Sequence, residues 1–331
     1  MPKRQGIFIL SADSLNLIYS PDHQAVIRRI VEVTEPPQTA ESIFNHLEQL
    51  EYTEMIFSGW GAPVFSDELL EAAPLLRMVF YGAGSIRGIV TDEFWKRGIR
   101  ITSAWGANAV PVVEYTLAQI ILCLKKAHTH ARQVKEQRSW ERFEVAGAYQ
   151  STIGIVSLGM IGRLLVEKLK TFDLRILAYD PFYNALEAHQ MGVEMVSLEE
   201  LFTLSDVVSL HTPWLPETEG MIQAKHFQLM KPGAAFINTA RGAVVAESEM
   251  IRVLVERPDL FAVIDVTHPE PPEPYSKLFD LPNVYLTPHI AGSMDRECWR
   301  MGQVMVDELS RYLEGKPLSF EISYERAKNL A

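Results

Sequence analysis

Three ionisable residues each follow a short apolar run that is typical of a β-strand. Arg241 ends the segment FINTAR, Glu270 follows AVIDVTHP, and His289 follows NVYLTP. Open parallel sheets bind ligands at the carboxyl ends of their strands, where these side chains would lie. An arginine fork suits a carboxylate, and an imidazole can hold and release a proton near neutral pH. The pattern favours proton transfer beside a bound anion, although each residue taken alone is common in surface or structural positions.

A glycine-containing turn lies earlier in the chain. The segment GIVSLGMIG (154–162) joins an apolar strand to a predicted helix over residues 160–171. A dinucleotide pyrophosphate binds at such a junction, on free N–H groups of the first helical turn. Ser157 takes the first glycine's place in the G-x-G-x-x-G pattern, where serine fits only if its φ permits. The predicted contacts are Gly159, Met160, Ile161 and Gly162.

The acid expected after such a turn is also present. The strand-like run LRILAYD ends in Asp180, which is 18 residues after Gly162. An acid about 20 residues on hydrogen-bonds the ribose 2′-hydroxyl of a dinucleotide. Its charge would repel the extra phosphate of NADP, and no arginine follows it directly. We therefore predict NAD as the cofactor.

Short apolar runs alternate with helical patterns along the whole chain. Such alternation indicates βαβ units and parallel sheets. Residues 110–136 and 294–313 are each predicted to form one helix, and the second half holds six strand-like runs. The predicted strands are residues 6–10, 54–59, 77–84, 99–104, 152–159, 174–180, 206–212, 234–240, 260–266 and 283–288. The predicted helices between the early strands are residues 40–50, 66–76 and 92–98.

Composition narrows the class of protein. A chain of 331 residues with 47% hydrophobic residues has room for about two domains. The formal charge of −11 disfavours nucleic acid and anionic membranes as partners. Two cysteines without metal-ligand spacing predict neither disulfides nor a metal site, which fits a cytoplasmic protein. The apolar stretch 110–124 is too short for a bilayer, so we expect no membrane segment.

In this order, these segments resemble the D-isomer-specific 2-hydroxyacid dehydrogenase family, which includes glyoxylate/hydroxypyruvate reductases and phosphoglycerate dehydrogenases. Matching stretches include SAWGANAVPVVEYTLA (103–118) and HTPWLPETEGMI (211–222). The resemblance implies an α/β protein with two doubly wound parallel-sheet domains. A Rossmann cofactor domain, residues 106–292, would be inserted into a flavodoxin-like substrate domain, residues 1–105 plus 293–331.

The resemblance also implies a reaction and a role for each ionisable residue. The reaction would interconvert a small D-2-hydroxy acid and its 2-keto acid by hydride transfer. His289 would be the general acid, Glu270 would hydrogen-bond it and favour its protonated form, and Arg241 would hold the substrate carboxylate. The backbone of Gly82, Ala83, Gly84 and Ser85 would also bind that carboxylate. Further cofactor contacts would come from Thr212, Pro213, Thr239, Ala240, Asp265 and His289.

Several alternatives stay open at this stage. Trp60 and Trp105 would line the substrate cleft or pack at a domain seam. An unphosphorylated substrate of the glyoxylate/hydroxypyruvate type is favoured, because phosphoglycerate dehydrogenases carry an arginine near Trp60. The chain could instead be a NAD-sensing, corepressor-like binding protein, or an enzyme whose cofactor site has decayed at Ser157. A homodimer through the cofactor domain is implied by the family.

Overall fold

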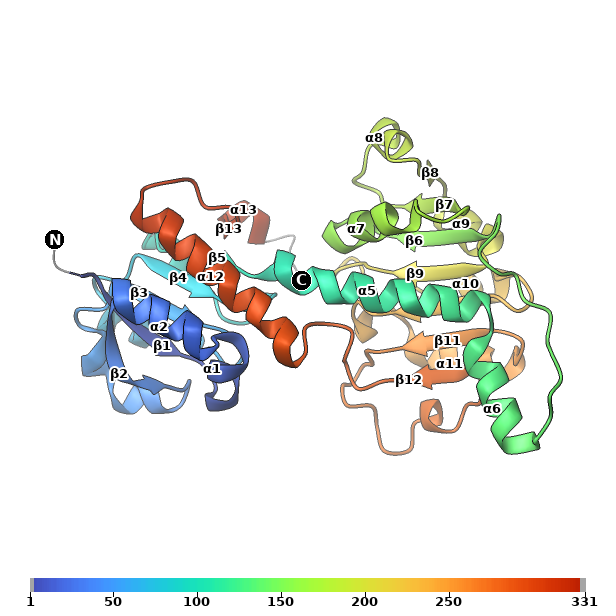
Figure 1. Cartoon of the computed structure of the whole chain (residues 1–331), viewed down its shortest axis with the longest axis horizontal. Helices are drawn as coiled ribbons and strands as arrows, with labels where there is room; N and C mark the ends of the chain where they lie inside the picture. The colour runs from blue at the N-terminus through green and yellow to red at the C-terminus, as the bar shows by residue number, and fades with distance from the viewer. Residues whose placement is uncertain (1–2, 328–331) are drawn as a thin grey trace. The chain divides into compact units, whose positions relative to one another are not determined.

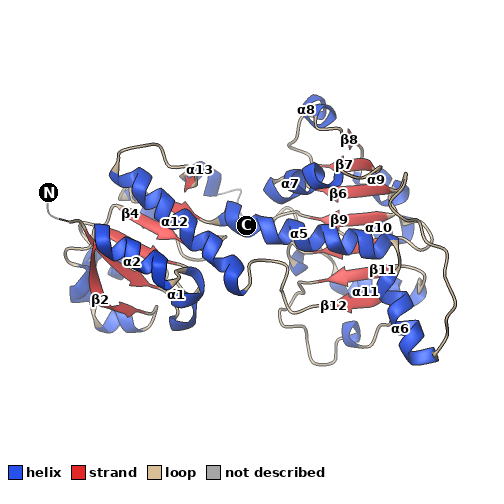
Figure 2. Ribbon diagram, in the orientation of Figure 1, coloured by secondary structure: helices blue, strands red, loops and turns tan. Residues whose placement is uncertain are grey.

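The strand-like runs of the sequence form two separate sheets in a computed structural model that describes residues 3–327. The chain divides into unit 1, Met1–Ala109 with Ser293–Ala331, and unit 2, Val110–Gly292. In each unit, helices cover both faces of a single sheet (Figures 1 and 2). The sequence-based boundary of 105/106 lies four residues before the first division, and the second division falls at 292/293.

The sheet of unit 1 has the strand order β13-β5-β4-β3-β1-β2. All neighbours pair in parallel except β13, which is antiparallel to β5. The order 2-1-3-4-5 of its parallel strands is that of a flavodoxin-like doubly wound fold, as predicted. The strands are β1 (Gln5–Ile9), β2 (Glu32–Gln38), β3 (Met55–Ser58), β4 (Met78–Tyr81), β5 (Arg100–Ser103) and β13 (Glu321–Ile322).

Helices pack on both faces of this sheet because both faces of its strands are apolar. In β1, Ile7 and Ile9 belong to one buried cluster, whereas Phe8 belongs to the other. Helix α12 lies along the second face beside α2 (Figure 1). The helices are α1 (Ala12–Ile18), α2 (Pro21–Ile30), α3 (Asp67–Ala72), α4 (Asp92–Lys96), α12 (Cys298–Leu313) and α13 (Tyr324–Ala327), with 3-10 turns η1 (Ser42–Asn45), η2 (Leu47–Leu50) and η5 (Asp295–Glu297).

Unit 2 contains a fully parallel sheet with the order β12-β11-β10-β9-β6-β7-β8. The chain winds outward in opposite directions from β6, so the strand order reverses between β6 and β9. This is a Rossmann arrangement, and ligands of such sheets bind at the reversal point. The strands are β6 (Thr152–Val156), β7 (Arg175–Tyr179), β8 (Glu194–Met195), β9 (Val207–Leu210), β10 (Ala235–Asn238), β11 (Phe261–Ile264) and β12 (Val284–Leu286).

The helices of unit 2 cover two apolar faces of its sheet. Val208 and Phe236 belong to one buried cluster, and Ile155 and Ile237 belong to the other. The helices are α5 (Trp105–Leu124), whose residues before Val110 belong to unit 1, α6 (Ala127–Gln137), α7 (Met160–Leu169), α8 (Ala185–Gln190), α9 (Leu198–Leu204), α10 (Ala224–Leu229) and α11 (Glu247–Glu256), with 3-10 turns η3 (Gly242–Val244) and η4 (Lys277–Phe279). Together the two sheets confirm the predicted fold class.

The single helix predicted over residues 110–136 is wrong. The structure has two helices, α5 and α6, which are separated at Lys125 and Lys126. Lys126 adopts a left-handed conformation with φ +49°, and its N–H group bonds to Cys123 O. Lysine is a good helix former, and neither glycine nor proline stands at residues 125–126, so nothing in the sequence signals a break there.

Other sequence-based boundaries also need correction. The helix predicted over residues 40–50 is a pair of 3-10 turns, because His46 leaves helical geometry with ψ +37°. The second sheet has a seventh strand, β8, whose two residues are too few to give a periodic signal. The helix predicted from residue 160 ends at Leu169, and the last long helix begins at Cys298 rather than residue 294.

Helix α5 is longer than the apolar stretch identified in the sequence. By length and hydropathy alone, it is the one helix among residues 3–327 that could cross a membrane. However, 56% of its apolar window is buried, and Val113 and Ile120 pack in a core cluster of unit 2. A buried core helix meets the same length and hydropathy criteria, so this feature alone is weak support for a membrane span.

Candidate functional site

The turn after β6 has the geometry of a dinucleotide-binding loop. Ser157 adopts φ +80°, a value that residues with a Cβ rarely take. A Cβ added at Gly162 would lie 2.2 Å from Ser157 O, so only glycine allows the helix to pack this closely on the turn. The second and third glycine positions are therefore occupied as the fold requires, and serine occupies the first in a glycine-like conformation.

The first turn of α7 is open to an anion. Gly159 is the N-cap, no side chain caps the helix, and the nearest atom to an added Cβ at Gly159 is 4.0 Å away. The N–H groups of Met160, Ile161 and Gly162 donate to no other residue within 3–327. Free N–H groups and the helix dipole together favour a phosphate at this position.

Asp180 joins the end of β7 to the glycine-containing turn. Its Oδ2 atom accepts the Leu158 N–H at 2.8 Å, and its Oδ1 atom accepts the Phe182 N–H at 2.9 Å. Ser157 Oγ lies 3.4 Å from Oδ2. A carboxylate has about four acceptor sites, so Asp180 can still accept a hydroxyl proton while it holds the turn.

Replacing Ser157 with glycine is expected to raise the free energy of unfolding by at most about 1 kcal/mol. Glycine relieves the cost of positive φ but is more flexible in the unfolded chain. The NADH dissociation constant should change by less than about threefold, because the turn is already formed with serine. Urea denaturation and NADH fluorescence titration measure both quantities. If the natural chain bound no detectable NADH and the Ser157→Gly variant did bind it, the cofactor site would have decayed at Ser157.

The carboxyl end of β9 holds two buried polar atoms without partners. Thr212 Oγ1 and His211 Nδ1 make no hydrogen bond to any residue within 3–327. Burial lowers the pKa of His211 to about 3, so its ring is neutral at physiological pH, with Nε2 3.0 Å from Ser209 Oγ. Buried polar groups are normally satisfied, so these atoms point to a ligand at the strand-order reversal. The sequence reading included Thr212 but missed His211.

Arg241 follows β10 at the same edge of the sheet. Asn238 fixes the turn, because its side chain accepts from Ala240 N at 3.0 Å and donates to Arg241 O at 3.1 Å. A Cβ at Gly242 would lie 2.0 Å from the backbone carbon of Thr267, so glycine lets this turn approach the segment that carries Glu270. The sequence analysis did not assign Asn238 or Gly242 to the site. The glycine directly after Arg241 could have indicated a close approach of the backbone there.

The guanidinium of Arg241 lacks a carboxylate partner. Its Nη1 donates to Ala240 O at 2.7 Å, and within residues 3–327 it forms no ion pair. Burial lowers the pKa of Arg241, and the charge of Glu270 opposes that effect. Arginine stays protonated in proteins, so this partly buried cation is suited to an external anion.

Glu270 and His289 form a hydrogen-bonded pair. His289 Nδ1 lies 2.5 Å from Glu270 Oε1, although 19 residues separate them in sequence. A carboxylate can only accept, so Nδ1 carries the proton and Nε2 is left as the free nitrogen. The two side chains are 48% and 42% exposed, so a substrate can reach Nε2. The pair adjoins a cavity of about 840 Å³ with apolar walls that include Leu278, Phe279 and Tyr285.

His289 itself has a left-handed backbone with φ +54°. For a residue with a Cβ this conformation costs roughly 1–2 kcal/mol, although histidine adopts it more often than most. Its N–H donates to Asp265 O at 2.9 Å, which ties the strained residue to the end of β11. Asp265 is only 2% exposed, so it supports the structure of the site from within the protein.

The loop after β4 in unit 1 offers backbone donors. The N–H groups of Ala83, Gly84 and Ser85 donate to no residue within 3–327, whereas Gly82 N donates to Ser58 O. Ser103 Oγ holds the loop by donating to Ala83 O at 2.8 Å and approaching Gly84 O at 2.5 Å. Successive free N–H groups form a concave site that can hold an anion.

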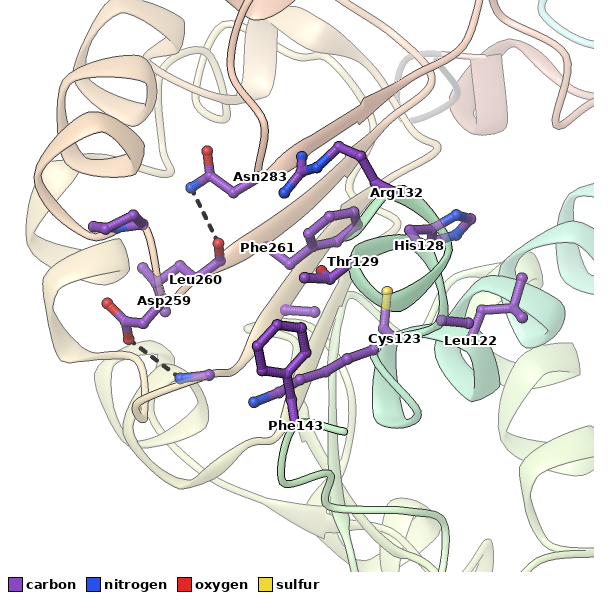
Figure 3. Close-up of a pocket in the computed structure, with 15 residues that line it drawn as sticks. Leu122, Cys123, His128, Thr129, Arg132, Phe143, Asp259, Leu260, Phe261 and Asn283 are labelled. Atoms are coloured by element: carbon purple, nitrogen blue, oxygen red, sulfur yellow. Dashed lines mark hydrogen bonds between the residues drawn. The ribbon is translucent and has the colours of Figure 1, made fainter. Parts of the chain in front are cut away.

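A second cavity of about 270 Å³ lies at the other edge of the unit 2 sheet. It is lined by the first residues of β10 and β11, Ala235 and Phe261, and contains none of the predicted site residues. Figure 3 shows the rings of Phe261 and Phe143 on its walls, beside Cys123 of helix α5. Strands of parallel sheets bind substrates at their carboxyl ends, so this cavity is separate from the chemistry.

Neither cysteine is expected to react with thiol reagents in the folded protein. Burial raises the pKa of Cys123 to about 12 and that of Cys298 to about 11, with Glu297 contributing to the latter. The thiolate is the reactive form, and at about pH 8 it would make up only ~10⁻³ or less of each thiol. Ellman's reagent should label no cysteine in native buffer and both in guanidinium chloride. Rapid labelling of native protein would contradict this expectation.

Comparison with known proteins places these features in context. The family model "D-isomer specific 2-hydroxyacid dehydrogenase, NAD binding domain" matches residues 117–291. The chain is 31% identical over 253 residues to a D-3-phosphoglycerate dehydrogenase of Archaeoglobus fulgidus, covering 76% of this chain and 48% of that protein. It is 34% identical over 254 residues to a glyoxylate reductase of Korarchaeum cryptofilum, covering 75% of this chain and 76% of that protein.

The fold of this chain is similar to those of solved structures over nearly the whole length of the chain. D-mandelate dehydrogenase of Rhodotorula graminis gives a TM-score of 0.81 at 23% identity, covering 98% of each chain. A phosphoglycerate oxidoreductase of Rhizobium etli gives 0.81 at 24% identity, covering 98% of this chain and 99% of the other. Among the sequence relatives, the chain spans about half the length of the phosphoglycerate dehydrogenases.

Proposed function

The chain belongs to the D-isomer-specific 2-hydroxyacid dehydrogenase family, and we propose that it interconverts a small D-2-hydroxy acid and its 2-keto acid. The family resemblance noted in the sequence is thereby confirmed, and so is NAD as the cofactor. When bound, the reduced cofactor NADH would supply the hydride for reduction, and the oxidised form NAD⁺ would accept it in oxidation. The remaining chemistry falls to side chains of the protein.

The observation that carries this proposal is the pairing of His289 with Glu270 at 2.5 Å. The Nδ1 proton is held by Glu270, so Nε2 is the position that exchanges a proton with substrate. In reduction, the ring must first be protonated on both nitrogens; Nε2 then gives its proton to the carbonyl oxygen as the hydride reaches the carbon, and the ring returns to the neutral form with its proton on Nδ1. In oxidation, Nε2 takes the hydroxyl proton, and the carboxylate of Glu270 stabilises the charged ring that results.

Arg241 and the loop 82–85 would bind the carboxylate of the substrate. The unpaired guanidinium of Arg241 supports its assignment, because a fork of N–H donors matches a carboxylate. The free N–H groups of Ala83, Gly84 and Ser85 support the assignment of the loop. The same guanidinium would draw electron density from the adjacent carbonyl and stabilise developing negative charge on its oxygen.

The residues proposed to hold NAD lie at the carboxyl edge of the unit 2 sheet. The free N–H groups of α7 suit the pyrophosphate, and Asp180 suits the ribose hydroxyls. The unpartnered Thr212 Oγ1 suits a polar group of the cofactor. The proposed cofactor contacts are Gly159, Met160, Ile161, Gly162, Asp180, Thr212, Pro213, Thr239, Ala240, Asp265 and His289.

NADH consumption with a panel of keto acids tests the proposal. The panel comprises glyoxylate, hydroxypyruvate, pyruvate, 2-ketoglutarate and 3-phosphohydroxypyruvate, with NADPH in parallel as the cofactor control. Turnover with NADH that exceeds turnover with NADPH would support the proposed class. NADH binding without turnover of any acid would instead favour a NAD-sensing binding protein.

We favour an unphosphorylated substrate of the glyoxylate/hydroxypyruvate type. The identity to a glyoxylate reductase, over three quarters of that protein, supports this choice. The phosphoglycerate dehydrogenase relatives support a phosphorylated acid as the alternative. Trp60 stands where such enzymes would place an arginine, and it packs half-buried against the core of unit 1. Faster turnover of 3-phosphohydroxypyruvate than of hydroxypyruvate would decide for the alternative.

We also propose that unit 2 pairs with a second copy of the chain. The segment 138–150 forms neither helix nor strand, yet it exposes Trp140 by 84% and Tyr149 by 72%. These two side chains supply exposed apolar surface on unit 2 that a second copy would cover. Light scattering should therefore give about twice the chain mass of 37.5 kDa, and the single-chain mass would contradict the dimer.

A further inference from the structure

The carboxylate of Asp265 is almost fully engaged by the turn that carries His289. Its Oδ1 atom accepts the Thr287 hydroxyl at 2.6 Å and the Ile290 N–H at 2.9 Å. Its Oδ2 atom accepts the Ala291 N–H at 2.9 Å. A carboxylate oxygen accepts about two hydrogen bonds, so Oδ1 is filled and Oδ2 keeps room for one further donor.

These contacts arise from the pairing of β11 and β12. Ile264 and Leu286 are partners in the parallel ladder, so Asp265 and Thr287 are neighbours just beyond its end. Thr287 N donates to Ile264 O, and His289 N donates to Asp265 O, both at 2.9 Å. Asp265 thus fixes the chain on both sides of His289, through its backbone and through both of its carboxylate oxygens.

Tyr115 extends this network to helix α5. Its hydroxyl lies 3.1 Å from Thr287 Oγ1, across 172 residues of sequence. The single Thr287 hydroxyl proton is donated to Asp265, which as a carboxylate can only accept. Tyr115 must therefore be the donor to Thr287. The order of donation is Tyr115 to Thr287 to Asp265, which fixes the hydroxyl of Thr287 in one orientation.

We propose that Asp265 is a positioning residue for His289, and that Thr287 and Tyr115 hold it in place. It acts by keeping the His289 backbone in its left-handed conformation, from which the imidazole reaches Glu270. A contact with NAD through the remaining acceptor position on Oδ2 is compatible with this role, but it would be a secondary one. The inference rests on the proposed function in that it assigns the proton-transfer role to His289.

Thr287→Val, with Thr287→Ser as its matched control, tests the network without touching Asp265. Valine keeps the shape and removes the hydroxyl, whereas serine keeps the hydroxyl. We expect valine to lower kcat by about tenfold and serine to keep at least about half of kcat, since catalysis is sensitive to small misplacements. The KM for NADH should stay unchanged in both. A rise in that KM with normal kcat would overturn the positioning role and favour a cofactor contact.

Asp265→Asn provides the stronger change. Asparagine presents an NH₂ group to at least one N–H donor of the turn, so we expect kcat to fall by about 10²-fold. Hydrogen exchange of the 287–291 segment should become faster in this variant, and that readout does not depend on turnover. Normal kcat in the variant would overturn the inference. If the natural chain turned over no acid, the proposed function would fail, and exchange alone would decide: unchanged exchange would overturn the positioning role.

Discussion

Replacing His289 with asparagine is expected to lower kcat for keto-acid reduction by about 10²–10⁴-fold, which is the usual contribution of a positioned general acid. Asparagine removes the proton that Nε2 would donate. It also tolerates positive φ, so the backbone at φ +54° should keep its conformation. Alanine would add backbone strain to the loss of the imidazole, and asparagine therefore gives the cleaner measurement.

Two controls separate chemistry from folding in that experiment. The urea midpoint of His289→Asn should match that of the natural chain, because among residues 3–327 the imidazole hydrogen-bonds only Glu270 and both side chains are partly exposed. A parallel NADH titration measures how much His289 adds to cofactor binding. Glu270→Gln should also lower kcat, because a neutral amide stabilises the charged ring less than a carboxylate does. If His289→Asn kept kcat within about threefold, proton donation would have to be assigned to another group.

The sequence was sufficient for features that depend on local pattern. Arg241, Glu270 and His289 could be placed at strand ends because a parallel sheet aligns the carboxyl ends of its strands along one edge. The glycine-containing turn and Asp180 followed from a short motif with a known backbone geometry. These inferences need only the order of strands and helices along the chain, which hydrophobic patterns reveal.

Features that depend on contacts between distant segments could not be predicted. The break at Lys126 is set by a left-handed residue of a type that favours helices. The donation from Tyr115 to Thr287 joins α5 to the end of β12, and no local pattern connects them. Gly242 could be noticed as a glycine, but its close approach to Thr267 appears only when two neighbouring turns are placed together.

The roles of His211 and Asp265 illustrate the same distinction. The sequence predicts both residues near the carboxyl ends of strands, within the runs 206–212 and 260–266. It cannot show that His211 Nδ1 has no partner within residues 3–327, or that the 287–291 turn occupies the Asp265 carboxylate. Hydrogen-bond capacity is a property of the assembled site, because each donor must find an acceptor in three dimensions. Residue type therefore predicts which residues are candidates for the site. Counting which of their hydrogen-bonding atoms already have partners then separates structural residues from those that can bind a ligand.

Replacing Arg241 with lysine is expected to reduce kcat/KM for the keto acid by about 10²–10³-fold, comparable to the loss of one donor that stabilises a developing oxyanion. Lysine keeps the positive charge but loses the planar fork, so the result isolates the geometry of recognition. Steady-state kinetics at saturating NADH measures the effect. Arg241→Met should be worse still, because it removes both the charge and the fork of N–H donors that match the carboxylate.

The alternative role for Arg241 is purely structural, since Nη1 donates to Ala240 O in its own turn. The two roles predict different responses to added guanidinium ion. If Arg241 binds the substrate carboxylate, millimolar guanidinium should restore part of the lost turnover in Arg241→Ala, because a free guanidinium can re-form the carboxylate pair. If Arg241 only supports the turn, Arg241→Ala should lose stability and NADH affinity together, and guanidinium should restore neither. Rescue of turnover with an unchanged urea midpoint would therefore place the guanidinium at the substrate.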